Sequence, residues 1–138
     1  RIESAMAIGT DLLPTILDIL DLPPPTDRVL DGESILPILR DSAPTPHDYL
    51  HYYDGDTLFA VRDQRFKYRG PAGVFYSTDQ MQVGGAIAQK EWLFDLDADS
   101  REAYDVSARY PEKLAELREE FARKNREMAA NPRGWADQ

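Results

Sequence analysis

Residues 57–69 contain two short runs of strand-forming residues, and this stretch most constrains how the chain can fold. In the second run, the aromatic residues Phe66 and Tyr68 alternate with cationic ones. Successive side chains of a β-strand point to opposite faces of a sheet, so the run separates an apolar face from a charged face. The stretch therefore predicts a hairpin with one side suited to a core and a cationic side formed by Arg65, Lys67 and Arg69.

Further strands and one long helix are expected around this hairpin. Strand-forming residues predict strands at residues 49–53, 57–62, 62–69 and 91–96, with a possible short strand at 74–76 and a surface loop at 77–90. The connections are too short for parallel crossovers, so the sheet should be mostly antiparallel. A helix is expected over residues 111–129, with apolar positions at Leu114, Leu117, Phe121 and Met128. The predicted class is α+β, a small antiparallel sheet of about four strands packed by a C-terminal helix.

The first part of the chain has a different character. A helix is expected from about Asp11, with Asp11 as its cap and an apolar face formed by Leu12, Leu13, Ile16, Leu17 and Leu20. The prolines at 23–25 must end it by Leu22. Ser34 is expected to cap a short second helix over residues 34–40. The first helix is so apolar that we expect it to pack against a large partner, which the rest of this chain does not supply.

A candidate domain boundary follows these helices. Residues 41–48 include two prolines and show no periodicity, which is typical of a linker. We therefore divide the chain into residues 1–44, which resemble the tail of a larger domain, and residues 45–138, which carry the sheet and its helix. Because the chain begins with Arg1 and not with methionine, it is expected to be a segment of a longer protein.

Composition excludes several classes of function. The formal net charge of −9 argues against a nucleic-acid binder. The chain has no cysteine, which excludes disulfides, thiol catalysis and cysteine–zinc sites within it. No apolar run is long enough to span a membrane. Nucleophile elbows, phosphate-binding loops and zinc-protease motifs are also absent from the sequence.

The remaining polar patterns allow two interpretations. The two histidines, His47 and His51, lie in a predicted loop and strand where they would not converge, so no metal site is expected. The cationic stripe, defined as Arg62, Arg65, Lys67 and Arg69, could bind an anion such as sulfate or a carboxylate, or it could be a solvated face paired with Asp95 or Asp97. Five carboxylates could act as acids or bases, yet all lie in or beside turns, where aspartate is expected for backbone reasons: Asp54, Asp56, Asp95, Asp97 and Asp99.

An ordered set of short motifs resembles the C-terminal part of a type I sulfatase, of the arylsulfatase A and N-acetylgalactosamine-6-sulfatase kind. The motifs are TDLLPTILD at 10–18, LDGESILP at 30–37, HYY at 51–53, FAVR at 59–62 with FK at 66–67, and WLFDLD at 92–97. The sequence departs from the family pattern at Phe94, where a tyrosine is usual, and at residues 100–102, where the family has a proline.

The resemblance implies that residues 1–44 end an alkaline-phosphatase-like α/β catalytic domain and that residues 45–138 form the C-terminal subdomain. It also implies sulfate-ester hydrolysis in the parent protein by a formylglycine, made from a cysteine, with a calcium ion. No catalytic residue, metal ligand or cofactor is expected in this segment. Its expected role is to complete the fold and to form part of the substrate-cleft rim, with His51, Tyr52 and Lys67 as candidate substrate contacts.

The resemblance also implies partners and a location. The expected partners are the rest of the sulfatase polypeptide and a sulfated sugar or aryl sulfate, and a periplasmic or extracellular location is suggested. Two alternatives remain at this point: a stand-alone α+β binding module, and a segment of a related phosphonate or phosphate monoester hydrolase.

Overall fold

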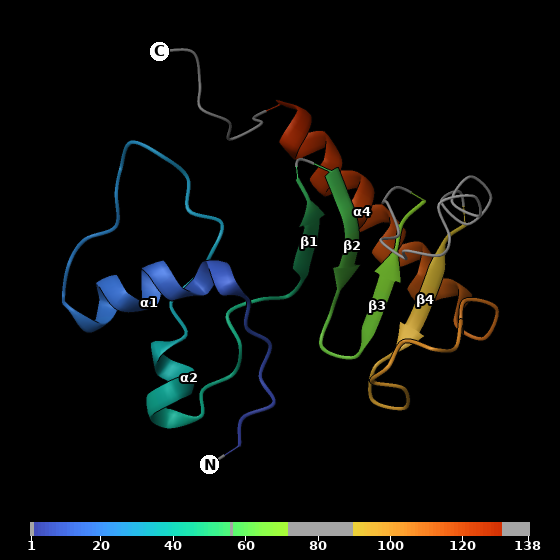
Figure 1. Cartoon of the computed structure of the whole chain (residues 1–138), viewed down its shortest axis with the longest axis horizontal. Helices are drawn as coiled ribbons and strands as arrows, with labels where there is room; N and C mark the ends of the chain where they lie inside the picture. Colours follow the sequence, from blue (N-terminus) through green and yellow to red (C-terminus); the bar gives the residue numbers. More distant parts are fainter. Residues whose placement is uncertain (1, 56, 72–89, 131–138) are drawn as a thin grey trace, which may run out of the picture. The chain divides into compact units, whose positions relative to one another are not determined.

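A computed structural model describes residues 2–55, 57–71 and 90–130 (Figure 1). The described part forms two compact units, one ending at Leu50 and the other starting at His51. The first unit contains the 3₁₀ turn η1 (Gly9–Asp11) and the helices α1 (Leu12–Ile19) and α2 (Leu36–Asp41). The strands are β1 (Leu50–Asp54), β2 (Thr57–Arg62), β3 (Phe66–Arg69) and β4 (Trp92–Asp95), and the helix α4 spans Pro111–Ala130. None of the helices within these ranges is both long and apolar enough to cross a membrane.

The sheet has the order β1-β2-β3-β4, which follows the order of the strands in the sequence. β3 pairs antiparallel with both of its neighbours, and Tyr68 lies opposite Val61 on one side and Leu93 on the other. Figure 1 shows α4 running across one face of this sheet. The predicted α+β class and the C-terminal helix are confirmed. The strand expected at 74–76, most of the loop expected at 77–90, and Asp56 lie outside the described residues.

The predicted alternation in β3 places the core. Tyr68 is 1% exposed and its ring meets the edge of Phe121 on α4, with the centroids 5.4 Å apart. Lys67, the next residue along, has its side chain on the opposite face. Leu117 of α4 is fully buried as well. Each large apolar side chain buried in this way contributes roughly 1.5–3 kcal/mol, so a few of them hold the helix on the sheet.

A polar contact also joins α4 to the sheet. The carboxylate of Glu91, just before β4, accepts hydrogen bonds from the Tyr68 hydroxyl (2.7 Å) and from the Arg118 guanidinium on α4 (2.9 and 2.6 Å). The hydrogen bonds from Arg118 and Tyr68 hold the pKa of Glu91 below its ordinary value, although burial opposes this shift. This cluster closes one edge of the aromatic contact beneath it.

The starts of the two N-terminal helices agree with the prediction only in part. α1 begins at Leu12 with Asp11 in the predicted cap position, but the Asp11 side chain makes no capping hydrogen bond to α1. Its carboxylate instead accepts the backbone N–H of Ile8, three residues earlier. α2 begins at Leu36 and not at Ser34. α1 ends at Ile19, before the prolines, and Asp21 adopts a left-handed conformation with φ of 55°.

The predicted apolar face of α1 is left uncovered by the described chain. Only Thr15 is buried on this helix. The exposed fractions of the large apolar residues on α1 and just after it are 61% for Leu12, 51% for Leu13 and Ile16, 53% for Ile19 and 59% for Leu20. Contiguous apolar surface of this kind is unusual on the solvent-exposed surface of a complete protein, and it indicates a contact site.

Residues 41–48, predicted to be a linker, are anchored to the start of the chain by side chains. Ser42 Oγ donates to Glu3 Oε1 over 2.9 Å, and Thr45 Oγ1 donates to the carbonyl oxygen of Met6 over 2.8 Å. These partners are 39 residues apart in the sequence, which is why local composition did not reveal them. The segment is irregular in backbone but fixed in position within the first unit.

Candidate functional site

Two of the three predicted substrate-contact residues meet on the sheet face opposite α4. The ammonium group of Lys67 on β3 lies 4.9 Å from the ring centroid of Tyr52 on β1. The same Nζ donates to Glu102 Oε1 over 2.7 Å. Glu102 belongs to the loop after β4 and has a left-handed φ of 56°. The result is a cation held between an aromatic face and a carboxylate, a group able to contact a polar or anionic ligand.

His51, the third predicted residue, points to the other face. Its Nε2 lies 2.8 Å from Glu120 Oε1 on α4. Because neighbouring residues of a strand alternate, His51 faces the helix while Tyr52 faces Lys67. The structure therefore brings Tyr52 and Lys67 together and places His51 apart from them.

The cationic stripe is occupied by contacts within the chain. Arg62 donates to the carbonyl oxygens of Asp63 and Gln64, both at 3.0 Å. Arg65 lies just before β3 and binds Asp95 through two hydrogen bonds of 3.0 and 2.6 Å. The hydrogen bonds from Arg65 hold the pKa of Asp95 below its ordinary value.

The other two residues of the cationic stripe also make contacts within the chain. Lys67 binds Glu102, and the Arg69 guanidinium lies 5.4 Å from the ring centroid of Phe59. Burial lowers the pKa of Arg69, with an opposing effect from the charge of Glu102. Of the two interpretations of this stripe, the paired one holds, and Arg65 with Asp95 is the pair that was expected. An anion-binding role for the stripe as a whole finds no support.

Two of the turn carboxylates have structural roles, Asp99 through backbone N–H groups and Asp95 through an ion pair. Asp99 accepts the backbone N–H groups of Arg101, Ala103 and Tyr104 at 3.1, 2.6 and 2.9 Å, which shapes the loop carrying Glu102. Asp95 is 5% exposed and bound to Arg65. These contacts leave neither residue arranged as an acid or a base.

Asp11 is the buried polar centre that local sequence patterns did not reveal. It is completely buried, and its carboxylate accepts the N–H groups of Ile8 (2.8 Å) and Glu33 (3.0 Å). The Nε2 atom of His47 lies 3.0 Å from both carboxylate oxygens. A side chain on Gly32 would come within 2.1 Å of the carbonyl oxygen of Thr10, so glycine is needed for this close approach.

The contacts of Asp11 join three segments of the first unit, namely the start of α1, the loop before α2 and the segment that leads into β1. No pattern in the sequence pairs Asp11 with His47, because they are 36 residues apart. The contacts of Asp11 therefore have a structural role, because they hold these three segments together. His47 takes part in them, whereas His51 has a different partner.

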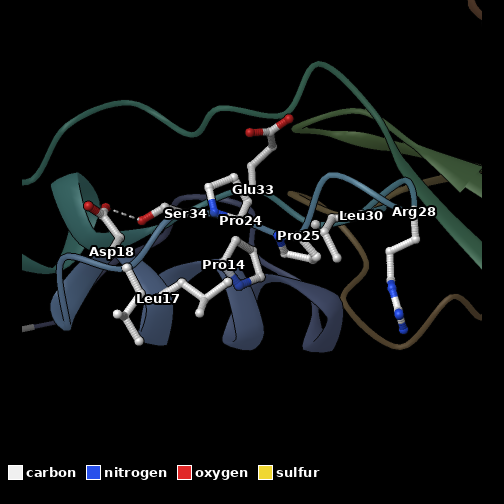
Figure 2. Close-up of a pocket in the computed structure, with 11 residues that line it drawn as sticks. Pro14, Leu17, Asp18, Pro24, Pro25, Arg28, Leu30, Glu33 and Ser34 are labelled. Atoms are coloured by element: carbon white, nitrogen blue, oxygen red, sulfur yellow. Dashed lines mark hydrogen bonds between the residues drawn. The ribbon is translucent and has the colours of Figure 1, made fainter.

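An open groove of about 440 Å³ lies in the first unit beside α1 (Figure 2). Its wall is mixed: apolar side chains come from Pro14, Leu17, Leu22, Pro24, Pro25 and Leu30, and polar ones from Asp18, Arg28, Glu33 and Ser34. Arg28 binds Asp27 through hydrogen bonds of 2.9 and 2.7 Å. The two carboxylates of the wall, on Asp18 and Glu33, repel an anionic ligand, so the groove does not favour a sulfate group.

Among the described residues there is no binding site for the calcium ion, and no precursor of the formylglycine, that the resemblance implies in the longer protein. Within residues 2–55, 57–71 and 90–130, no three histidine, aspartate or glutamate side chains are grouped as a metal ion requires. Formylglycine is made from cysteine, and the sequence contains none.

Comparison with known proteins identifies sulfatase relatives. A family model for the C-terminal region of aryl-sulfatase matches residues 45–137. An arylsulfatase from Hemicentrotus pulcherrimus is 28% identical over 127 residues, which cover 78% of this chain and 23% of the relative. An N-acetylglucosamine-6-O-sulfatase from Bacteroides thetaiotaomicron is 30% identical over 129 residues, which cover 83% of this chain and 20% of the relative.

A solved structure shares this fold as well. A protein in complex with its substrate, D-glucosamine-2-N,6-O-disulfate, superposes with a TM-score of 0.62 at 25% identity, and the match covers 98% of this chain and 27% of that one. The chain thus spans between 20% and 27% of the length of these relatives.

Proposed function

This chain belongs to the family of aryl-sulfatase C-terminal regions, and we propose that it completes the fold of a longer sulfuric ester hydrolase. The family match over residues 45–137 carries this proposal. The motif order and the small share of each relative that is covered agree with a C-terminal position. In the proposed parent protein, calcium and formylglycine supply the chemistry of sulfate-ester cleavage, and both are held by residues outside this chain.

The activity of the parent protein tests the proposal directly. The longer protein that carries this chain should hydrolyse an aryl sulfate or a 6-sulfated glucosamine, and it should lose that activity when residues 45–138 are removed. Mass spectrometry should find formylglycine at an upstream cysteine. A parent with no such cysteine, or one that cleaves phosphate or phosphonate monoesters in preference to sulfates, would contradict the proposal.

The exposed face of α1 is the proposed contact with the rest of the polypeptide. This assignment rests on the exposure of Leu12, Leu13, Ile16 and Leu20. The boundary between residues 1–44 and 45–138 belongs to the same proposal, with the first part as the end of the larger domain. A stand-alone binding module would instead have covered this face within its own fold.

Changing Leu13 and Ile16 together to glutamine should separate these alternatives. In the 138-residue chain, the double variant is expected to bind much less of a dye specific for apolar surface, because two exposed apolar side chains are lost. In the longer protein, the same change should lower stability by roughly 1.5–3 kcal/mol per side chain. Arg40→Gln on α2 is the control and should change neither result. A longer protein that tolerates the double change would show that this face is not buried there.

Tyr52 and Lys67 are the proposed contributions of this chain to the substrate-cleft rim, and His51 is a further proposed contact from the opposite face of β1. The support is the Lys67 ammonium group held against Tyr52 and Glu102. An ammonium group in this setting can donate a hydrogen bond to a sulfate or hydroxyl oxygen of a substrate.

Replacing Lys67 with methionine should weaken substrate binding in the longer protein. KM for a sulfated sugar is expected to rise by roughly threefold to tenfold while kcat stays nearly constant, because one polar contact is lost equally from the bound substrate and from the transition state. Lys90→Met removes a similar charge from the segment before β4 and serves as the control. An unchanged KM in the Lys67 variant would remove Lys67 from the rim.

A further inference from the structure

A buried charged cluster joins the edge strand β1 to α4. Glu120 is 8% exposed and its carboxylate binds Arg123 through two hydrogen bonds, both of 2.6 Å. The same carboxylate is the partner of His51 Nε2 at 2.8 Å. The side chain of His51 is 17% exposed. The contact therefore joins two nearly covered ionisable groups across the interface between strand and helix.

Burial is the main factor that disfavours a positive charge on His51, and the charges around it act in both directions. On α4, Arg123 and Lys124 act on the imidazole with positive charge and Glu120 with negative charge. Arg123 and Lys124 are also bound to Glu127, at 3.2 and 3.1 Å. On the neighbouring strand β2, the ionisable residue is Arg62, which donates to the carbonyl oxygens of its own turn. The tie between β1 and α4 thus fits a neutral imidazole that donates its Nε2–H to an ionised Glu120 carboxylate.

We propose that His51, Glu120 and Arg123 form an acid-sensitive clasp that holds β1 against α4 at neutral pH and loosens when His51 becomes protonated. Burial lowers the pKa of His51, and the hydrogen bond with Glu120 only partly offsets this effect. Burial alone would raise the pKa of Glu120, but the hydrogen bonds from Arg123 and His51 outweigh it and keep that carboxyl ionised. The clasp concerns the stability of the second unit and does not depend on the proposed hydrolase activity.

The direction of the pH dependence follows from these shifts. The folded chain binds the imidazole proton less readily than the unfolded chain, whose histidine has an ordinary pKa of 6.5. The contribution of His51 to folding is therefore complete well above pH 6.5 and is lost as the pH falls through the lower folded pKa. The contribution of Glu120 is lost only at still lower pH, below its ordinary value of 4.5.

Hydrogen exchange and NMR on the full chain test the clasp. Between about pH 7.5 and pH 5, the protection factors of the α4 amides around Glu120, corrected for the intrinsic pH dependence of exchange, should fall severalfold. The NMR titration of His51 should give a midpoint below the 6.5 of an unperturbed histidine. A midpoint at or above that value, or constant protection over this range, would overturn the proposal.

Three variants distinguish the clasp from general acid destabilisation. His51→Gln keeps an N–H donor for Glu120 and should remove the fall in protection. Glu120→Gln should move the His51 midpoint to lower pH, because the carboxylate that favours the imidazolium is gone. His47→Gln alters the other histidine, in the first unit, and should leave the fall in α4 protection unchanged. The proposal is wrong if the fall in protection persists in His51→Gln, or if the His51 midpoint rises in Glu120→Gln. If a variant does not fold, the His51 titration of the natural sequence decides between the outcomes.

Discussion

Replacing Asp11 with alanine is expected to destabilise the first unit by roughly 3–5 kcal/mol. The carboxylate is completely buried and accepts hydrogen bonds from Ile8, Glu33 and His47, which come from three separate segments. Its removal leaves two backbone N–H groups and an imidazole without that partner in a covered site. Each such unsatisfied donor costs about 1–3 kcal/mol, and no apolar contact replaces the lost bonds.

Hydrogen–deuterium exchange with mass spectrometry can measure this effect on each unit separately. Peptides within residues 2–50 should lose protection in Asp11→Ala, while those of α4 keep theirs and act as an internal reference. Asp18→Ala is the matched control, because Asp18 is exposed and accepts a hydrogen bond from the exposed Ser34 hydroxyl; it should change stability by no more than about 1 kcal/mol. Equal effects of the two variants would show that the Asp11 contacts do not hold the first unit together.

Replacing Phe121 with alanine should destabilise the second unit by roughly 3–5 kcal/mol, as is usual for a large aromatic side chain removed from a core. Phe121 is 8% exposed and packs edge-on against Tyr68 at 5.4 Å between ring centroids. Its loss leaves a cavity between α4 and β3. Thermal or urea unfolding followed by far-ultraviolet circular dichroism measures the change. Leu114→Ala, at a partly exposed position on the same helix, should cost distinctly less.

Gly70 provides an internal test of this packing. A Cβ atom on Gly70 would lie 2.5 Å from the tip of the Phe121 ring, so Gly70→Ala should be destabilising by about 1–3 kcal/mol in the natural sequence. In the Phe121→Ala background the obstructing ring is absent, and the same substitution should cost much less. A double-mutant cycle would therefore show strong coupling between the two positions. Additive effects would mean that the ring moves away from Gly70 without cost.

Several elements were predictable because their signals are local. Alternation in β3 assigns Phe66 and Tyr68 to the core, and helical spacing in α4 places Leu117 and Phe121 on the buried face. Pro111 marks the start of α4, and the prolines after Leu22 exclude any continuation of α1. A short connection requires neighbouring strands to pair antiparallel, which the register of β3 with β2 confirms; β4 also pairs antiparallel with β3. These features depend on backbone geometry and on residues close in sequence.

The partners of the polar residues could not be predicted in this way. Asp11 has the appearance of an ordinary helix cap, yet the fold buries it and joins it to His47, 36 residues later. His51 and Tyr52 are neighbours in sequence, but strand alternation and the position of α4 give them opposite partners. For the cationic stripe, the sequence allowed either an anion site or a face paired with Asp95 or Asp97, and the structure places Asp95 beside Arg65 and Glu102 beside Lys67.

The sequence by itself therefore determined the class of fold, the core faces and the family resemblance, because periodicity, prolines and ordered motifs act over short distances. The tertiary structure decided which charges are paired, which carboxylates are buried and which apolar face is left open. The physical reason is that a charge interacts with whatever the fold brings within a few ångströms, and the residues brought there are separated by tens of positions along the chain.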